Sequence, residues 1–451
     1  MAAIMTGAFN RLAGVLAIKL AQNLPVLLNT EQQVSKEVFE SGKSANGLTM
    51  NYVLPDYGEV VNGPTLDETK MNYTAGVVPV SLQQYNISFS AGSYTMVNPN
   101  GAGNPPTFPQ GYEDPTAIGG TTMTRNQLLD FEKQVKFPFG ANLASRMQKK
   151  TIKAGVLGAG TTVVLSAADQ SAGKTLWDAF SEAASAIRNA RSDDEVFGAV
   201  SPRMAARAAR GAANLFHPAA QITKLWNKCE LGEFATATWY ETADMGFFTA
   251  IAAGDGLVVE DAQATPPVTL SFAANISTQG ATDLTLSAAL SQAVPAGMPF
   301  RLADANGVPI EEVDPLGNST GVPFTFIVAE DYDPNGSTPT TLKVQPLYTE
   351  GALRNIDRFP QTTDVVVPVL NAGKTYAYGL AWAKPGLATA WGQMDQLEGA
   401  NNFSFGPAKG LLFYGASMAD IVHRRNIWRL DALKGETVTM SNWVANIMVE
   451  L

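Results

Sequence analysis

Apolar residues recur at helical spacing at the start of the chain and again after residue 127. Leucines four residues apart predict an amphipathic helix over residues 9–24, which ends at Pro25. A second apolar stripe runs from Leu128 to Met147 with spacings of three and four, and Pro138 lies inside it. Because a proline removes a backbone hydrogen bond and clashes with the preceding turn, this stripe predicts one long helix with a kink.

Two further helices are predicted in the middle of the chain. Apolar residues from Leu176 to Ile187 share one face of a predicted helix over 175–190. Ser201 and Pro202 form the usual start of a helix, in which a capping hydroxyl is followed by proline at the first helical position. They predict a helix through the Ala- and Arg-rich stretch that follows.

Alternation of apolar and polar residues marks two extended segments in the first hundred residues. The first runs from Leu48 to Leu54 and closes at Pro55, and the second runs from Val80 to Phe89. About two dozen residues separate them, whereas hairpin loops usually have about two to five. This spacing predicts a long two-stranded arm that projects from the body; a floppy surface loop is the alternative.

The pattern of apolar and polar residues changes after about residue 264. Helical spacing vanishes, and short Thr-, Val-, Leu- and Phe-rich runs alternate with turn residues until about residue 372. These runs predict five or six strands of a compact β-barrel or sandwich. The runs are 268–272, 284–290, 324–328, 341–346 and 365–370. A mixed pattern follows over 375–391, and strand-like runs at 428–430 and 443–449 close the chain. An all-β block between α+β segments indicates an insertion into a loop of a parent domain.

Composition points to surfaces that other subunits cover. Only 16% of the residues are charged, against about 25% in ordinary soluble domains, while 45% are hydrophobic. That hydrophobic content excludes an intrinsically disordered chain. Weakly charged surfaces suit burial against other subunits better than free solubility. The net charge of -10 argues against nucleic-acid binding by counterion release, which needs a clustered positive surface.

No catalytic or metal-binding constellation stands out in the sequence. Cys229 is the single cysteine, which excludes an intramolecular disulfide, and packing in a core or interface explains it better than catalysis. His217 and His423 are the two histidines and cannot supply a metal-ligand cluster. We therefore expect no enzyme activity, no cofactor and no metal site. The apolar segment 12–28 is interrupted by polar residues and lacks a cleavage site, so we expect neither a membrane span nor a signal peptide.

Three short motifs resemble functional ones but fail in their context. The stretch SAGKT at 171–175 lacks the first glycine of a phosphate-binding loop, because position 168 is alanine. The stretch GNSTG at 317–321 matches a nucleophile elbow, but a strand-like segment follows it where a helix is required. The run from Asp331 to Gly336 resembles a calcium loop, but Leu342 stands where the bidentate glutamate should be. Turns and a helix start explain these motifs better.

Seven stretches, in their order along the chain, carry a family resemblance. They are GLTMNYVLP at 47–55, VVPVSLQQYNISF at 77–89, FPFGANLASRMQKK at 137–150, LGEFATATWYETADMGFFTA at 231–250, the barrel-like runs 300–307 and 324–328, and NIWRLDALKG at 426–435. In this order they resemble the major capsid protein of tailed double-stranded-DNA bacteriophages. More narrowly, the chain is similar to the coat proteins of short-tailed phages that carry an insertion domain.

The resemblance implies an α+β fold of the tailed-phage major capsid type, with an inserted all-β, barrel-like domain. The implied parts are an N-terminal arm and helix (1–43), an extended β loop (44–91), an irregular linker insertion (92–126), the spine helix and peripheral domain (127–174), the axial domain (175–263), the inserted β-domain (264–372) and a return to the axial and peripheral domains (373–451). The linker is longer than the family leads one to expect, and a lattice contact or a surface decoration would explain it.

The resemblance also implies a structural protein that acts through copies of itself. Hexamers and pentamers would form the icosahedral head of a virion, assembled in the bacterial cytoplasm around double-stranded DNA that is enclosed without sequence-specific binding. The implied partners are a scaffolding protein, a portal protein and, as a further candidate, a decoration protein; no membrane is involved. The extended loop would lie over a neighbouring subunit. Its expected intersubunit contacts are Leu48, Met50, Tyr52, Leu54, Tyr57, Val80 and Leu82.

Two alternatives remain open at this point. An encapsulin-like bacterial nanocompartment shares the parent fold, although the inserted β-domain and the chain length favour the phage interpretation. A carbohydrate-active enzyme with a β-sandwich binding module would need two placed carboxylates. The tight acidic cluster that could supply them is Asp304, Glu311, Glu312 and Asp314.

Overall fold

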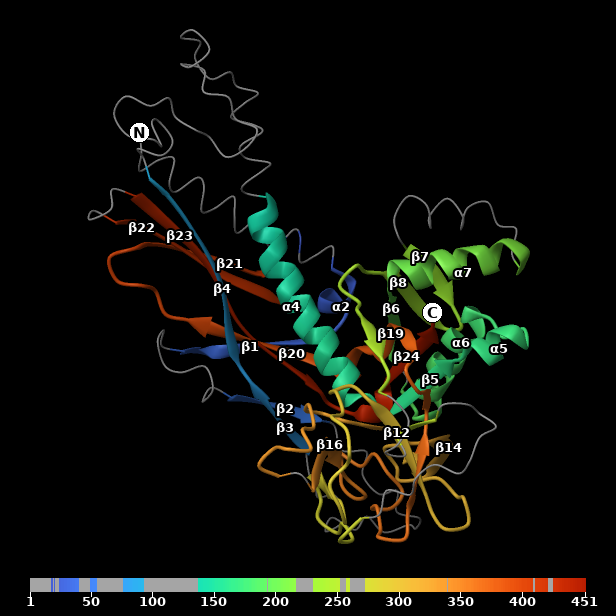
Figure 1. The fold of residues 1–451 in the computed structure, drawn as a ribbon. Coiled ribbons are helices and arrows are strands. Elements are labelled where there is room, and N and C mark those ends of the chain that lie inside the picture. Colours follow the sequence, from blue (N-terminus) through green and yellow to red (C-terminus); the bar gives the residue numbers. More distant parts are fainter. Residues whose placement is uncertain are drawn as a thin grey trace, which may run out of the picture.

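The structure, a computed structural model, consists of two sheets separated by a long helix, with a β-rich segment beneath them (Figure 1). It describes residues 18, 20, 24–39, 49–54, 76–92, 137–192, 194–215, 230–251, 257–259, 272–338, 340–408, 410–420 and 425–451. No helix in this part of the chain is long and apolar enough to cross a membrane.

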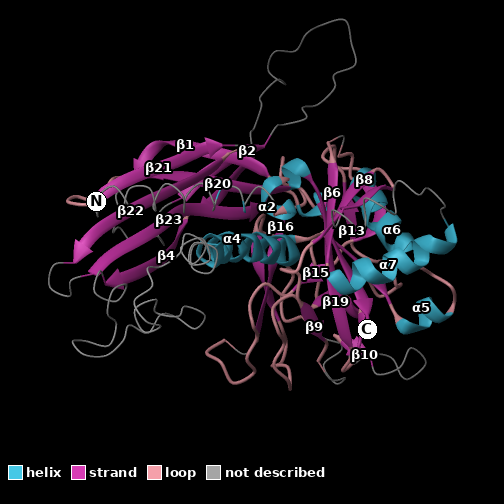
Figure 2. Ribbon diagram, turned by 90° about the horizontal axis from the view of Figure 1, so that it is seen from above, coloured by secondary structure: helices cyan, strands magenta, loops and turns pink. Residues whose placement is uncertain are grey.

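One of the two sheets has seven strands in the described part of the chain, in the order β5-β24-β19-β6-β8-β7, with β9 also paired to β19. These strands are β5 (Thr161–Leu165), β24 (Val444–Glu450), β19 (Thr375–Ala383), β6 (Val196–Val200), β8 (Ala237–Glu241), β7 (Glu230–Phe234) and β9 (Phe247–Thr249). Helices α5 (Ala167–Ser171), α6 (Leu176–Asn189) and α7 (Pro202–Leu215) lie on one side of this sheet (Figure 2).

The two helices predicted around residues 175–190 and 202–213 are confirmed as α6 and α7. The Thr175 hydroxyl accepts a hydrogen bond from the Asp178 N–H, and the Asp178 carboxylate accepts one from the Thr175 N–H, which completes a capping box. The apolar face of α6 is buried on the seven-stranded sheet, where Phe180 stacks on Trp239 with ring centroids 4.3 Å apart. Ser201 caps α7 as expected, by accepting from the Met204 N–H.

The other sheet has six strands in the described part, in the order β1-β20-β23-β22-β21, with β4 on the other edge of β23. These are β1 (Glu31–Phe39), β20 (Leu387–Met394), β23 (Arg425–Val438), β22 (Leu411–Asp420), β21 (Asn401–Ala408) and β4 (Gln83–Gly92). Pro25 begins the short helix α2 (Pro25–Leu28), and most of the helix predicted over residues 9–24 lies outside the described residues. The segment 375–391, with its mixed sequence pattern, forms β19 of the seven-stranded sheet and the first part of β20 of this sheet.

Helix α4 (Phe137–Gly158) packs between the two sheets because glycines on it allow a close approach on both sides (Figure 2). A Cβ at Gly155 would come 2.7 Å from a Leu380 methyl group on the seven-stranded sheet. A Cβ at Gly158 would come 2.6 Å from Val438 on the six-stranded sheet. The long predicted helix is confirmed from residue 137 onward; the part before it, and with it the predicted kink, lies outside the described residues.

The β-rich segment over 272–372 surrounds one hydrophobic cluster. Its strands are β11 (Ala281–Thr285), β12 (Pro299–Ala303), β13 (Glu311–Val313), β14 (Ser319–Pro323), β15 (Phe326–Ile327), β16 (Thr341–Leu347), β17 (Val365–Pro368) and β18 (Leu370–Asn371), the last paired with β10 (Val258–Val259). The cluster includes Phe300 and Phe326 of this segment and extends to Tyr376 and Met448 of the seven-stranded sheet. Two short 3-10 helices, η4 (Lys384–Gly386) and η5 (Ser441–Trp443), each connect a strand of one sheet to a strand of the other.

Candidate assembly site

The arm predicted from the sequence is a two-stranded sheet of β2 (Thr49–Leu54) and β3 (Gly76–Ser81). The strands run antiparallel, with Thr49 opposite Ser81 and Leu54 opposite Gly76. Among the described residues, β2 and β3 pair only with each other. The predicted second strand divides at Leu82: β3 stays in the arm, and β4 joins the six-stranded sheet beside β23.

The root of the arm is anchored on the protein's own sheet. Val80 is 2% exposed and Leu82 is fully buried, and both pack against Ala390 and Leu433. A Cβ at Gly435 would come 2.6 Å from the Ser81 carbonyl oxygen, so glycine is required for β3 to lie this close to β23. The expectation that Val80 and Leu82 contact a neighbouring subunit is therefore corrected, because their side chains have no surface left for it.

The other expected contacts of the arm lie farther from this root. Met50, Tyr52 and Leu54 lie on β2, but their side chains, together with Leu48 and Tyr57, lie outside the described part of the structure. They remain predicted contacts.

A groove of about 520 Å³ lies where the arm, α4 and the β-rich segment meet. Val77 and Val78 of β3 line one wall, Leu157 of α4 lines another, and Lys343 and Gln345 of β16 line a third. Val77 is 47% exposed. The arm thus leaves the body at a place where three elements of the fold converge.

A buried polar network connects α4 to the six-stranded sheet just beside the root of the arm. The fully buried Lys434 Nζ donates to Thr151 Oγ1 at 2.6 Å and lies 3.0 Å from Glu436 Oε2. The Tyr85 hydroxyl donates to Glu436 Oε1 at 3.1 Å. Burial lowers the pKa of Lys434, and burial together with the Glu436 charge raises the pKa of Tyr85. The network holds β4, β23 and α4 in one arrangement.

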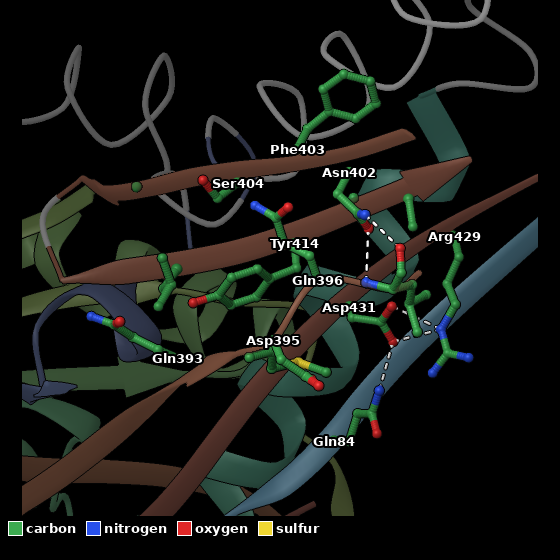
Figure 3. A pocket seen from close by; sticks show the side chains of 16 residues that line it. Gln84, Gln393, Asp395, Gln396, Asn402, Phe403, Ser404, Tyr414, Arg429 and Asp431 are labelled. Carbon is green, nitrogen blue, oxygen red and sulfur yellow. Dashed lines mark hydrogen bonds and ion pairs between the residues drawn. The ribbon is translucent and has the colours of Figure 1, made fainter. Parts of the chain in front are cut away.

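A second cavity, of about 550 Å³, lies on the six-stranded sheet near the β20–β21 connection (Figure 3). Arg429 Nε lies 2.8 Å from both carboxylate oxygens of Asp431, and Gln84 Nε2 donates to Asp431 Oδ1 at 3.0 Å. Burial raises the pKa of Asp431. At the edge of the cavity, Asn402 Oδ1 accepts a hydrogen bond from the Leu397 N–H, and Asn402 Nδ2 donates one to the Leu397 carbonyl oxygen. The side chains that line this cavity include no histidine or cysteine.

The four carboxylates that an enzyme interpretation would need serve structural roles. Asp304 accepts hydrogen bonds from backbone N–H groups of its own turn, and Glu311 accepts one from the Ser319 hydroxyl. Asp314 Oδ2 lies 2.6 Å from Arg191 Nε. Glu312 is fully buried and accepts from the Thr161 hydroxyl. None of the four lines either of the two cavities described above.

Glu312 belongs to a buried polar seam that joins the β-rich segment to the seven-stranded sheet. Burial raises the pKa of Glu312 to about 8. Asn442 Nδ2 donates to the Val313 and Asn355 carbonyl oxygens at 2.7 and 3.0 Å. Gln345 Nε2 donates to the Thr325 carbonyl oxygen at 2.8 Å. Buried polar groups of this kind fix orientation, because a displaced partner leaves them unpaired.

The three motif-like stretches are turns or helix starts in the structure. Lys174 pairs with Asp169 at 2.8 Å beside the start of α6. Gly317 has a φ of +86° in a turn, and strand β14 follows it, which confirms the turn interpretation. Asp331 and Asp333 accept hydrogen bonds from backbone N–H groups. Within the described residues there is no metal-ligand cluster of three or more acidic, histidine or cysteine side chains. Cys229, His217 and His423 lie outside that part.

Solved structures similar to this chain are phage capsids and a virus-like particle. The sequence matches no known family and no curated protein. The capsid of the Cyanophage P-SCSP1u is 10% identical with a TM-score of 0.38, covering 93% of this chain and 86% of that chain. The capsid of Ralstonia phage GP4 is 9% identical with a TM-score of 0.39, covering 94% and 87%. The virus-like particle from Pyrococcus furiosus is 8% identical with a TM-score of 0.33, covering 96% of each chain. Two of these three structures are phage capsids.

Proposed function

We propose that this chain is the major capsid protein of a tailed-phage head and that it functions by binding copies of itself. The observation that carries the proposal is the arm. An isolated two-stranded hairpin is at best marginally stable in water and needs a surface to pack on. Beyond its anchored root, β2–β3 has no strand partner among the described residues. A neighbouring copy supplies the missing surface.

The low charge of the chain supports the same function. At 16% charged residues, much of its surface is neutral and polar, which favours burial against other subunits. The net charge of -10 suits a capsid shell that encloses DNA without binding it tightly.

Each part of the tailed-phage capsid fold can be assigned to an element of this structure. In this proposal α4 is the spine helix, the six-stranded sheet belongs to the peripheral domain and the seven-stranded sheet to the axial domain. The segment 272–372 is the inserted β-domain, held by the polar seam around Glu312 and Asn442. Scaffolding and portal proteins, and a decoration protein, are the proposed partners. The site of action is the virion capsid, assembled in the host cytoplasm, and no enzymatic step is part of the function.

The arm deletion is the sharpest test of this proposal. The full chain, expressed alone and together with a candidate scaffolding protein, should form closed shells in electron micrographs. Removal of residues 56–76 should leave a folded subunit, because the anchors Val80 and Leu82 remain, but stable shells should no longer form. Circular dichroism and thermal unfolding of the deleted chain control for loss of fold. Shells that form equally well without these residues, or a full chain that stays monomeric in every condition, would refute the proposal.

A further inference from the structure

The edges of the two sheets differ in how they are protected. A free strand edge offers unpaired N–H and C=O groups, and proteins usually block such an edge with charge, proline or a cover. In the described part of the chain, the open edges of the two sheets belong to β1, β4, β5, β7, β21 and the three-residue strand β9. Of the five longer edges, three are blocked, and two are not.

The blocked edges use charge or side-chain cover. Strand β1 carries Glu31, Lys36 and Glu37, and β7 carries Glu230 and Glu233.

Strand β5 has no charge, but the β-rich segment covers its outer edge. Arg301 Nη2 donates to the Thr162 carbonyl oxygen at 3.2 Å, and the Thr162 N–H donates to Thr325 Oγ1 at 3.1 Å. Its edge is therefore satisfied within the chain.

Strands β4 and β21 lack both kinds of protection. The ten residues of β4 (QQYNISFSAG) include no charged residue and no proline. The eight residues of β21 (NNFSFGPA) include no charged residue, and Pro407 lies at the irregularity near its end. No other strand of the described residues pairs with the outer edge of either.

These two edges also match each other. They border the same half of the six-stranded sheet, in the order β4-β23-β22-β21, and every pair in it is antiparallel. Four alternating strands leave β4 and β21 running in opposite directions. A second copy placed alongside in the same orientation therefore brings its β4 antiparallel to the β21 of the first.

The two strands also have the same distribution of apolar and polar residues on their two faces. The register aligns Phe405, Phe413, Ala432 and Tyr85 in one row across the sheet, all in or against the hydrophobic cluster beneath α4. On the opposite face, exposed short polar residues stand on both edge strands. They are Asn86 and Ser88 on β4 and, on β21, Ser404 with the half-buried Asn402. Pairing of β4 with β21 would continue the apolar face with apolar residues and the polar face with polar ones.

We propose that β4 of one copy pairs antiparallel with β21 of the next copy, so that their six-stranded sheets join into one continuous sheet. The contact is heterologous, and repeated contacts of this kind close into a ring when the rotation from one copy to the next divides a full turn. Main-chain hydrogen bonds supply the affinity, and the alternating faces fix the register. This inference rests on the proposed self-assembly and adds a second contact that does not involve the arm.

Disulfide trapping tests this contact in assembled shells. In a Cys229→Ser background, Asn86→Cys or Ser88→Cys on β4 is combined with Asn402→Cys or Ser404→Cys on β21. Directly opposed antiparallel residues have Cβ atoms about 4.5–5.5 Å apart, close to the reach of a disulfide. Within one chain the two strands are three strand spacings apart, roughly 14 Å, so an intramolecular bond cannot form.

The expected result is a ladder of covalent oligomers after mild oxidation for at least one of the four pairs. Each single-cysteine variant should stay uncrosslinked by itself, and a mixture of a β4 variant with a β21 variant should give only dimers. Gln33→Cys on the charged β1 edge, paired with Ser404→Cys, is the matched control and should give no ladder. Intact shells without crosslinks in all four pairs would overturn the contact and leave the proposed function standing. Crosslinking of a single variant with itself would also overturn it, in favour of a symmetric contact. Failure of the Cys229→Ser parent to form shells would contradict the proposed function and this contact together.

Discussion

The seven-stranded sheet and the six-stranded sheet differ in how their faces and edges are covered. In the described residues of the first, α5, α6 and α7 cover one side and α4 packs on the other, and the β-rich segment satisfies the edge of β5 through Thr325 and Arg301. The second carries a two-stranded arm at one corner and has unprotected edges at β4 and β21. In the proposed assembly, the seven-stranded half would mainly secure the fold, and the six-stranded half would contact neighbouring copies.

The largest effect on folding is expected in the seven-stranded half. Trp239 is fully buried and stacks on Phe180, so Trp239→Ala should lower the free energy of unfolding by about 3–5 kcal/mol. The arm variant Tyr52→Asp should leave unfolding nearly unchanged and weaken shell formation. Denaturant unfolding of both variants, together with electron microscopy, checks the contrast. Equal losses of folding stability in the two variants would remove it.

The buried network beneath the arm should rank next. Lys434→Ala removes the partner of Glu436 and should cost about 3 kcal/mol, because a charge in a buried pair is left without compensation. The matched control is Lys343→Ala, whose exposed pair with Asp283 contributes little, so stability should hardly change. Thermal unfolding of the two variants measures the difference. A Lys434→Ala protein as stable as its control would show that the network is dispensable.

The polar seam should show a smaller effect. Asn442→Ala leaves the Val313 and Asn355 carbonyl oxygens unpaired and should cost about 1–3 kcal/mol. Asn306→Ala in an exposed turn should stay within about 0.5 kcal/mol of the parent. Urea unfolding compares the two. A result in the reverse order would mean that the seam does not orient the β-rich segment.

The pH dependence of folding should report Glu312. Its pKa is raised from 4.5 to about 8 in the folded chain, so at intermediate pH the folded state keeps a proton that the unfolded state has lost. The free energy of unfolding should therefore fall as pH rises from 4.5 through about 8, and Glu312→Gln should flatten that slope. Denaturant unfolding at a series of pH values checks this, with the exposed Glu330→Gln as control. An unchanged slope in Glu312→Gln would contradict the assignment.

The arm root is expected to tolerate little change. Gly435→Ala would place a Cβ 2.6 Å from the Ser81 carbonyl oxygen, so β3 must shift away from β23, and both the rate of assembly and the folding stability should fall. Gly246→Ala meets no atom within 4 Å and is the control. Light scattering during assembly compares the two rates. Identical rates would show that the root tolerates movement.

Features that depend on residues close together in the sequence could be predicted, and features that depend on distant residues could not. Helices α6 and α7 were predictable because Thr175, Ser201 and their apolar stripes lie within a few residues of each other. Strand pairing in the six-stranded sheet was not, since β4 meets β23 across more than three hundred residues. Alternation showed that Val80 and Leu82 would be buried, but it did not reveal that their partners, Ala390 and Leu433, belong to the same chain. The buried state of Glu312 had no sequence signal beyond an acidic cluster.

Electron cryo-microscopy of assembled particles tests the central claim most directly. If the account holds, the density for β2–β3 of each subunit will lie on the adjoining subunit, while Val80 and Leu82 remain seated on their own sheet. Solitary particles in which Tyr52 packs against its own body would contradict it.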